Sequence, residues 1–401
     1  MDQQYVYMIE WSNGTLISAA KVWLISGLIL SALFTLRVAA LVAFIKVAIV
    51  MVYFCFFSDG IWFYGGDDYT YYEKGMEFLS SGANPLSITR EPVFRWYFFA
   101  KTGFAFQIYY NYLALYLLEP RYYAPVLGLV VVNCMTVVLL VKALAIGNAQ
   151  KLYASILAIF LLLHWHTIAW TSFLDIKDPL VGLGMAIGIY LITRFRSNPL
   201  IFGSLFAGLI YSFHWLRFYF PVFFAGSIFL SNAIILSWRM RVVLVLVGVP
   251  IGVYVLSSQI GLAAKMSELE SIVYGLVHFL LQPAPWRITE PASYLFIPSI
   301  IHWLMVIPTV VGAMLLIKRR TETGVEVGIV FISVFILGVL FYAAVPAIAS
   351  TRHRSPLDLL MAVMQFHFFW WVLQYWAKNG LKDARLAGNQ HHNKVLTGQE
   401  N

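Results

Sequence analysis

Residues 123–146 read YAPVLGLVVVNCMTVVLLVKALAI, and Lys142 is the one charged residue among them. A run of about twenty mostly apolar residues is long enough to cross the hydrocarbon core of a bilayer as one helix. The whole chain of 401 residues shares this character, since 61% of it is hydrophobic and 11% is charged. Soluble domains carry about 25% charged residues. We therefore expect lipid, rather than water, to surround most of this protein.

Nine further apolar runs resemble residues 123–146 in length and composition. They cover residues 38–58, 151–168, 176–194, 199–215, 218–237, 240–260, 296–317, 325–346 and 356–376. The stretch 22–36 is shorter, and is either an eleventh span or a helix in the interface. The sequence thus predicts an all-α polytopic membrane protein with about 10–11 transmembrane helices. We expect a single membrane domain over residues 1–376 and a disordered cytoplasmic tail over residues 377–401.

Lys and Arg gather in alternate connections between these runs. They are Lys151, Arg194, Arg196, Arg239, Arg241, Lys318, Arg319 and Arg320. Because cytoplasmic loops are enriched in Lys and Arg, we assign these connections to the cytoplasm. The first outer loop is then 59–122, within which 93–118 is expected to form an interfacial helix, and the second is 261–295. The net charge of +8 does not indicate nucleic-acid binding, since the basic residues are spread over many loops.

The outer loops also hold basic residues, against the usual topological bias. They are Arg90, Arg95, Arg121, Lys177, Arg217, Arg287, Arg352 and Arg354. An anionic ligand on the outer face would account for this charge. Snorkelling side chains and salt bridges at the interface would account for it as well.

Residues 58–72 read SDGIWFYGGDDYTYY and follow the outward-running span 38–58. The adjacent carboxylates of Asp67 and Asp68 raise each other's pKa, and such a pair suits a general base or a metal site. Tyr69 and Tyr72 belong to a group of aromatic residues that offers flat, hydrogen-bonding surfaces to a sugar. Alternatively, one of the two aspartates caps a helix that begins near Tyr69.

Three further segments follow on the predicted outer face. Residues 174–181 read LDIKDPLV, 280–287 read LLQPAPWR, and 351–358 read TRHRSPLD. Together with the aspartate motif, and in this order, they resemble the GT-C glycosyltransferases, membrane enzymes that take sugars from polyprenyl-phosphate donors. The likeness covers residues 38 to about 376. It departs from the family at Ser355 and Pro356, where an aliphatic residue is common.

The resemblance implies a GT-C-like bundle in a bacterial inner membrane, with interfacial helices and an active site on its outer face. It implies an inverting transfer from a polyprenyl-phosphate sugar donor to a glycan or glycolipid acceptor of the cell envelope or an exopolysaccharide. The general base falls on Asp67 or Asp68. The leaving lipid phosphate needs cations, for which the candidates are Arg352, Arg354, Arg287, Lys177 and Arg217.

No cofactor is certain for such a site, although some relatives use a divalent cation. If Mg²⁺ or Mn²⁺ binds, Asp67 and Asp68 would hold it together with Asp175 or Asp178. An ordinary helix start also explains Asp178 followed by Pro179. In the same way, Arg352 and Arg354 would bond the last carbonyls of the span that ends near residue 346 if they had no ligand.

Two other classes of function stay open. An O-antigen polymerase or ligase would use outer arginines and a histidine instead of the aspartate motif. A transporter or flippase of an anionic lipid or solute would need ionisable residues at mid-bilayer depth and broken spans, and we expect neither. His164 and His166 are expected at an outer span end, as interfacial anchors rather than metal ligands.

Overall fold

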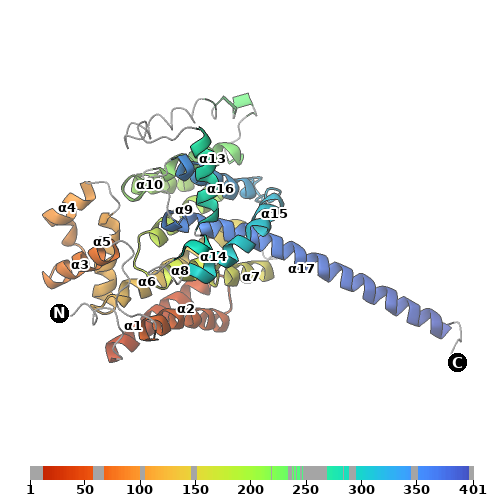
Figure 1. Ribbon diagram of the computed structural model, residues 1–401, viewed down its shortest axis with the longest axis horizontal. Coiled ribbons are helices and arrows are strands. Elements are labelled where there is room, and N and C mark those ends of the chain that lie inside the picture. Colours follow the sequence, from red (N-terminus) through yellow and green to blue (C-terminus); the bar gives the residue numbers. More distant parts are fainter. Residues whose placement is uncertain are drawn as a thin grey trace.

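The chain folds into a bundle of helices, seen here in a computed structural model (Figure 1). The structure describes residues 12–56, 67–99, 104–145, 151–217, 219–233, 269–282, 284–288, 295–344 and 351–396, with isolated positions between 237 and 246. Within these ranges every regular element is a helix. The prediction of an all-α membrane protein is therefore confirmed.

Among the residues that the structure describes, four helices are long and apolar enough to cross a membrane. They are α1 (Asn13–Leu30), α2 (Leu36–Phe56), α6 (Tyr123–Leu144) and residues 354–379 of α17 (Thr351–Leu396). Helix α1 begins earlier than the uncertain stretch 22–36, because the Ser12 side chain caps it by accepting from the Thr15 N–H. The uncertain stretch thus belongs mostly to a helix of spanning length.

Two predicted spans are broken. Helices α7 (Lys151–Leu162) and α8 (Trp165–Thr171) meet at a bend of 50°, and α14 (Phe296–Leu304) and α15 (Val306–Leu316) meet at 54°. At the second bend Pro308 cannot donate to the Leu304 carbonyl, so the regular helical ladder is lost there. Counting each bent pair as one span gives six candidates in the described part of the chain, against ten predicted from hydropathy for the whole chain. The expectation that broken spans are missing was wrong.

The remaining predicted spans appear as shorter apolar helices. These are α9 (Asp178–Arg194), α10 (Pro199–Leu216), α11 (Phe220–Leu230) and α16 (Val327–Ala344). The predicted span 240–260 falls almost wholly outside the described residues. Helix α9 starts one residue after Lys177, with Pro179 in its first turn. A helix start at this point is therefore confirmed, although Lys177 and not Asp178 is the N-cap residue.

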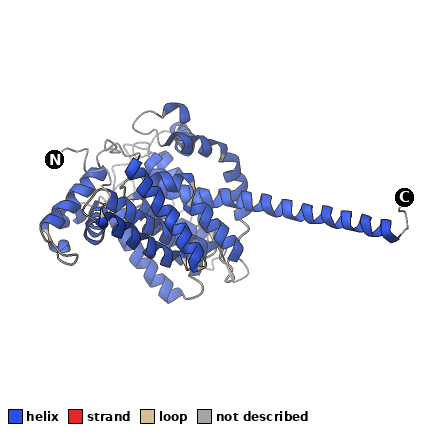
Figure 2. Ribbon diagram, turned by 90° about the horizontal axis from the view of Figure 1, so that it is seen from below, coloured by secondary structure: helices blue, strands red, loops and turns tan. Residues whose placement is uncertain are grey.

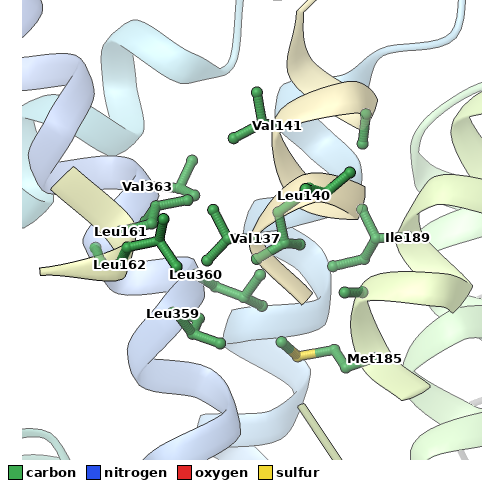
Figure 3. Packing of buried hydrophobic residues seen from close by; sticks show 14 of the residues in the cluster. Val137, Leu140, Val141, Leu161, Leu162, Met185, Ile189, Leu359, Leu360 and Val363 are labelled. Carbon is green, nitrogen blue, oxygen red and sulfur yellow. The ribbon is translucent and has the colours of Figure 1, made fainter. Parts of the chain in front are cut away.

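The core lies where α6, α7, α9 and α17 meet (Figure 3). Val137 and Val141 of α6 project toward Leu161 of α7 and Leu360 of α17, and each of these four side chains is 0% exposed. Glycines let other helices approach closely. A Cβ atom at residue 328, at the start of α16, would lie 1.8 Å from the Leu316 carbonyl oxygen of α15. Without a strong driving force between helices in lipid, such close backbone contacts carry much of the packing.

The described part of the first loop holds three α-helices, a 3-10 turn (Ile88–Arg90) and a second apolar cluster of its own. Helices α3 (Asp67–Ser80), α4 (Pro92–Phe99) and α5 (Phe104–Leu117) lie together at one side of the bundle (Figure 1). Their cluster includes Tyr71, Phe78, Ile108 and Tyr112. The predicted helix over 93–118 is therefore two helices, with residues 100–103 between them outside the described part.

The second loop and the tail also contain helices. Helix α13 (Leu269–Leu281) and the short 3-10 turn η5 (Pro285–Arg287) lie within the predicted loop 261–295. Helix α17 runs on to Leu396 and projects from the bundle (Figure 2), whereas a disordered tail was expected over 377–401. Among residues 377–396 there is no proline to end the helix, and Ala, Leu, Lys and Arg favour its continuation.

Lys46 lies at the midpoint of α2 and is 0% exposed. Its Nζ atom has no hydrogen-bond partner among the residues that the structure describes. The side chain faces the bundle, near Cys134 of α6. The sequence reasoning overlooked this lysine when it placed no ionisable residue at mid-bilayer depth.

Candidate functional site

The aspartate motif begins helix α3, two residues before the start near Tyr69 that the capping alternative predicted. Asp67 is the first residue of the helix, and its side chain lies outside the described part of the structure. The Asp68 side chain is 0% exposed, and its Oδ2 accepts a hydrogen bond of 3.1 Å from the Tyr122 hydroxyl. Tyr72, one turn after Asp68, contacts the same tyrosine ring edge to face, with 5.7 Å between ring centroids. Asp68 and Tyr72 thus meet at Tyr122, a residue that the sequence analysis did not single out.

A second carboxylate lies close to Tyr122. Burial raises the pKa of the Tyr122 phenol well above its ordinary value, and the carboxylates of Asp68 and Asp175 raise it further. Tyr122 therefore remains protonated and donates to Asp68. Asp175 is also 0% exposed, and its Oδ1 accepts a 2.6 Å hydrogen bond from Gln107 Nε2 of α5. Two buried carboxylates from segments about a hundred residues apart are thereby brought to one phenol.

Lys177 is the predicted cation nearest in sequence to this group. It precedes α9, is 8% exposed, and its Nζ lies 4.7 Å from the centroid of the Phe104 ring. The other predicted cations are dispersed. Arg287 is exposed in η5, and the side chain of Arg352 lies outside the described residues. Tyr69 is half-buried on α3.

Arg217 is paired with Asp178 rather than facing open space. Its Nη2 lies 2.9 Å from Asp178 Oδ1, and the two side chains are 11% and 1% exposed. The hydroxyls of Tyr219 and Tyr342 form a hydrogen bond beside this pair. Asp178 is thus bonded to an arginine, while Asp68 and Asp175 gather at Tyr122. Among the described residues no three His, Cys, Asp or Glu side chains converge as a metal site would need.

Arg354 is wholly buried at the start of α17. Its Nε donates to Asp358 Oδ1 at 2.8 Å, and its Nη1 donates to the carbonyl oxygens of Phe279 and Leu280 at 2.9 and 3.0 Å. These carbonyls belong to the end of α13, not to the span near residue 346. Residues 351–358 are helical instead of an extended turn. Residues two apart on a helix lie on different faces, so the backbone does not place residues 352 and 354 side by side.

A chain of histidines, which sequence reasoning did not place at the site, joins Asp358 to the two bent spans. His166 Nδ1 of α8 lies 3.6 Å from Asp358 Oδ2. His166 Nε2 is 3.1 Å from His302 Nδ1 of α14, and His302 Nε2 is 2.6 Å from the Leu280 carbonyl oxygen. His164 and His166 are each 2% exposed, so the prediction that they are interfacial anchors was wrong. Their position in a His-Trp-His run at a break was the available signal.

A small cavity of about 20 Å³, lined in part by polar side chains, adjoins this chain of histidines. It is lined by His166 and Asp358, by Asp178 at the start of α9, and by Asn133 and Thr136 of α6. A cavity of this size holds about one water molecule. The cavity connects the His166–Asp358 pair with the Asp178–Arg217 pair. Comparisons of the chain with protein-family models, with curated proteins and with solved structures found no match.

Proposed function

We propose that this chain is a membrane glycosyltransferase of the GT-C type. It transfers a sugar from a polyprenyl-phosphate donor to a glycan or glycolipid acceptor on the outer face of the membrane. One observation carries the proposal: the buried carboxylates of Asp68 and Asp175 lie around the Tyr122 phenol, at an end of an apolar bundle. A carboxylate pair beside a membrane is costly to keep unless chemistry requires it.

In this reaction Asp68 is the general base. The acceptor hydroxyl loses its proton to the Asp68 carboxylate as its oxygen attacks the anomeric carbon, and the bond from that carbon to the lipid phosphate breaks. The Tyr122 hydrogen bond to Oδ2 fixes the orientation of the carboxylate and supports its charged form. Lys177 is the described cation best placed to balance the charge of the departing phosphate. Asp67 stays the alternative base.

The test is sugar transfer by the purified chain in proteoliposomes, with a panel of polyprenyl-phosphate monosaccharides. The Asp68→Asn variant is expected to lose about 10²–10⁴-fold in rate, the usual contribution of a general base. Asp67→Asn tests the neighbouring acid. Glu326→Gln, at the other end of the bundle, is the matched control and should keep full activity. Full activity in the single variants and in the double Asp67→Asn, Asp68→Asn variant would refute the mechanism.

A second candidate is a transporter or flippase of an anionic solute or lipid. Broken spans and a buried lysine at the middle of a helix are features of transport proteins, and both bent pairs and Lys46 are present here. The His166–His302 hydrogen bond further joins the two broken spans. The same proteoliposomes decide between the candidates. Movement of a lipid-linked sugar across the bilayer without any covalent product would favour transport.

A further inference from the structure

The contacts of the two histidines determine where their protons lie. The Leu280 carbonyl oxygen can only accept, so His302 Nε2 must carry the proton in their 2.6 Å contact. A neutral His302 then has a bare Nδ1, which must accept from His166 Nε2. A neutral His166 in turn has a bare Nδ1, and this atom faces Asp358 Oδ2 at 3.6 Å. Two acceptors therefore oppose each other at the end of the chain.

Counting protons gives the same result without choosing a tautomer. The chain has three contacts: Asp358 to His166, His166 to His302, and His302 to the Leu280 oxygen. Each contact needs one proton, and two neutral imidazole rings supply two. The first contact is the longest, at 3.6 Å. The structure thus has the geometry of a chain that lacks one proton at the His166–Asp358 contact.

The cavity described above opens at this contact. Within the described part of the chain, His166 Nδ1 and Asp358 Oδ2 are buried without a hydrogen-bond partner, and both residues line the cavity. Buried polar atoms without partners are rare and commonly mark an ordered water or a functional group. Two bare acceptors beside space for one water select a hydrogen-bond donor, that is, a water molecule or a single hydroxyl group.

Charged and polar groups from several elements surround the His166–Asp358 contact. Arg354 of α17 donates to the other Asp358 oxygen, and Asp178 of α9 lines the cavity while bonded to Arg217. His164, before α8, is bonded to Gln365. The Leu280 carbonyl of α13 accepts from His302, and the neutral side chains of Asn133 and Thr136 of α6 line the cavity. Arg354 balances the charge of Asp358, so the chain can stay deprotonated until a proton reaches the cavity.

We propose that Asp358, His166 and His302 form a buried proton-accepting site, which binds one proton at the His166–Asp358 contact and takes a water or hydroxyl group as its ligand in the cavity. On uptake, a proton from the aqueous phase joins His166 Nδ1 or Asp358 Oδ2, and the His166–Asp358 contact becomes a hydrogen bond. The site does not depend on the aspartate motif or on the proposed sugar transfer. It places a second group able to take a proton from a hydroxyl group inside the bundle.

The test is ¹⁵N NMR of histidine-labelled, full-length protein in lipid nanodiscs across a pH series. Ring nitrogen shifts distinguish the two neutral tautomers from the imidazolium ion. At high pH we expect His166 and His302 to be neutral with the proton on Nε2. On acidification the chain should gain one proton, seen as His166 Nδ1 protonation or as a carboxylic-acid infrared band of Asp358. Retention of the Nδ1–H tautomer by His166 at every pH, or no uptake before unfolding, would overturn the proposal.

Two variants should abolish the uptake for different reasons. In Asp358→Asn the side-chain amide supplies the missing hydrogen to His166 Nδ1, so no further proton is needed. In His302→Phe, His166 has no histidine to donate to, so its single ring proton can lie on Nδ1 and face Asp358. The one remaining contact then has the one proton that it needs. Asp68→Asn is the control, and its proton uptake should equal that of the unmodified chain. Proton uptake that persists in both Asp358→Asn and His302→Phe would place the proton elsewhere and contradict the proposal. The unmodified protein gives the tautomer result even if a variant fails to fold.

Discussion

The two ends of helix α9 hold charge in opposite ways. At the acid end, which includes Asp68, Asp175, Asp178, Arg217, Arg354 and Asp358, the charged side chains are buried and bonded to other side chains. At the basic end, which includes Lys151, Arg194, Arg196, Arg319 and Arg320, most cations bind backbone oxygens or aromatic faces. Arg196 Nη1 donates to the Thr323 carbonyl at 3.0 Å, and the Arg319 guanidinium lies 4.0 Å from the centroid of the Tyr153 ring.

We interpret the basic end as charge that sets the orientation of the protein in the membrane, and the acid end as charge that belongs to a functional site. Carbonyl oxygens and ring faces satisfy a cation at the water boundary with little desolvation. A buried ion pair costs several kcal/mol per ion in desolvation before its attraction is counted. The basic end therefore needs no explanation beyond topology. At the acid end, the desolvation of the buried charges indicates that they serve a function.

The largest test of this contrast is the Asp178–Arg217 pair. The Asp178→Asn substitution leaves a buried arginine without its carboxylate, and we expect a loss of about 3–5 kcal/mol in the free energy of unfolding. Unfolding by SDS in mixed micelles measures it. Replacing Arg217 with Met in the same chain should restore part of the loss. A loss in the single variant no greater than that of an exposed pair would show that the acid end is not energetically distinct.

At the basic end, backbone packing should matter more than charge. Gly328→Ala places a Cβ against the Leu316 carbonyl oxygen at the 1.8 Å noted above, so the α15–α16 contact must open. We expect a loss of about 1–3 kcal/mol, typical of overpacking. Gly208→Ala in α10 is the matched control, since nothing lies within 4 Å of its added Cβ. Equal stability of the two variants in the same micelle assay would contradict the close approach.

Two tyrosines give a paired comparison of the ends. Tyr122→Phe removes the donor to buried Asp68, and we expect a loss of about 1–3 kcal/mol. Tyr153→Phe removes a 3.0 Å hydrogen bond with His367 but keeps the ring under Arg319, so its loss should be about 0.5–1.5 kcal/mol. Unfolding of both variants under identical conditions measures the difference. The reverse order would mean that Asp68 does not rely on Tyr122.

The smallest effect is expected at the exposed Arg320–Glu326 pair. The two side chains are 65% and 17% exposed and lie 2.8 Å apart. Arg320→Gln should cost about 0–1 kcal/mol, and added salt should reduce the difference from the unmodified chain. Unfolding measured at low and high salt tests this. A larger loss in the free energy of unfolding, unchanged by salt, would mean that this pair behaves like the buried pairs of the acid end.

Local patterns predicted the elements that depend on local chemistry. Apolar length found α2 and α6 to within a few residues, and the Asp178-Pro179 pair marked the start of α9. Hydropathy could not find the breaks at His164 and Met305, because the apolar run continues through both. A bend follows from a lost backbone bond, and a window average does not register it.

The site was predictable only in part, for a related reason. Asp68 and Tyr72 share a helix face at a spacing of four residues, so the sequence brings them together. Other partners are distant in sequence. Asp178 lies 39 residues from Arg217, the Phe279 and Leu280 carbonyls lie 75 and 74 residues from Arg354, and His302 lies 136 residues from His166. Such pairings depend on how helices pack, and a single sequence does not determine that.

The buried Lys46 has a consequence for how the chain enters the membrane. A lysine at the centre of a helix costs about 2.5–3.5 kcal/mol when the helix inserts into lipid alone. In the folded bundle α1 and α6 pack against α2, where Lys46 is wholly buried, and α1 is synthesised first. Helix α2 therefore enters the bilayer most favourably beside α1, as a hairpin of two helices. We therefore expect α1 and α2 to enter the membrane as one unit, with α6 packing against α2 afterwards.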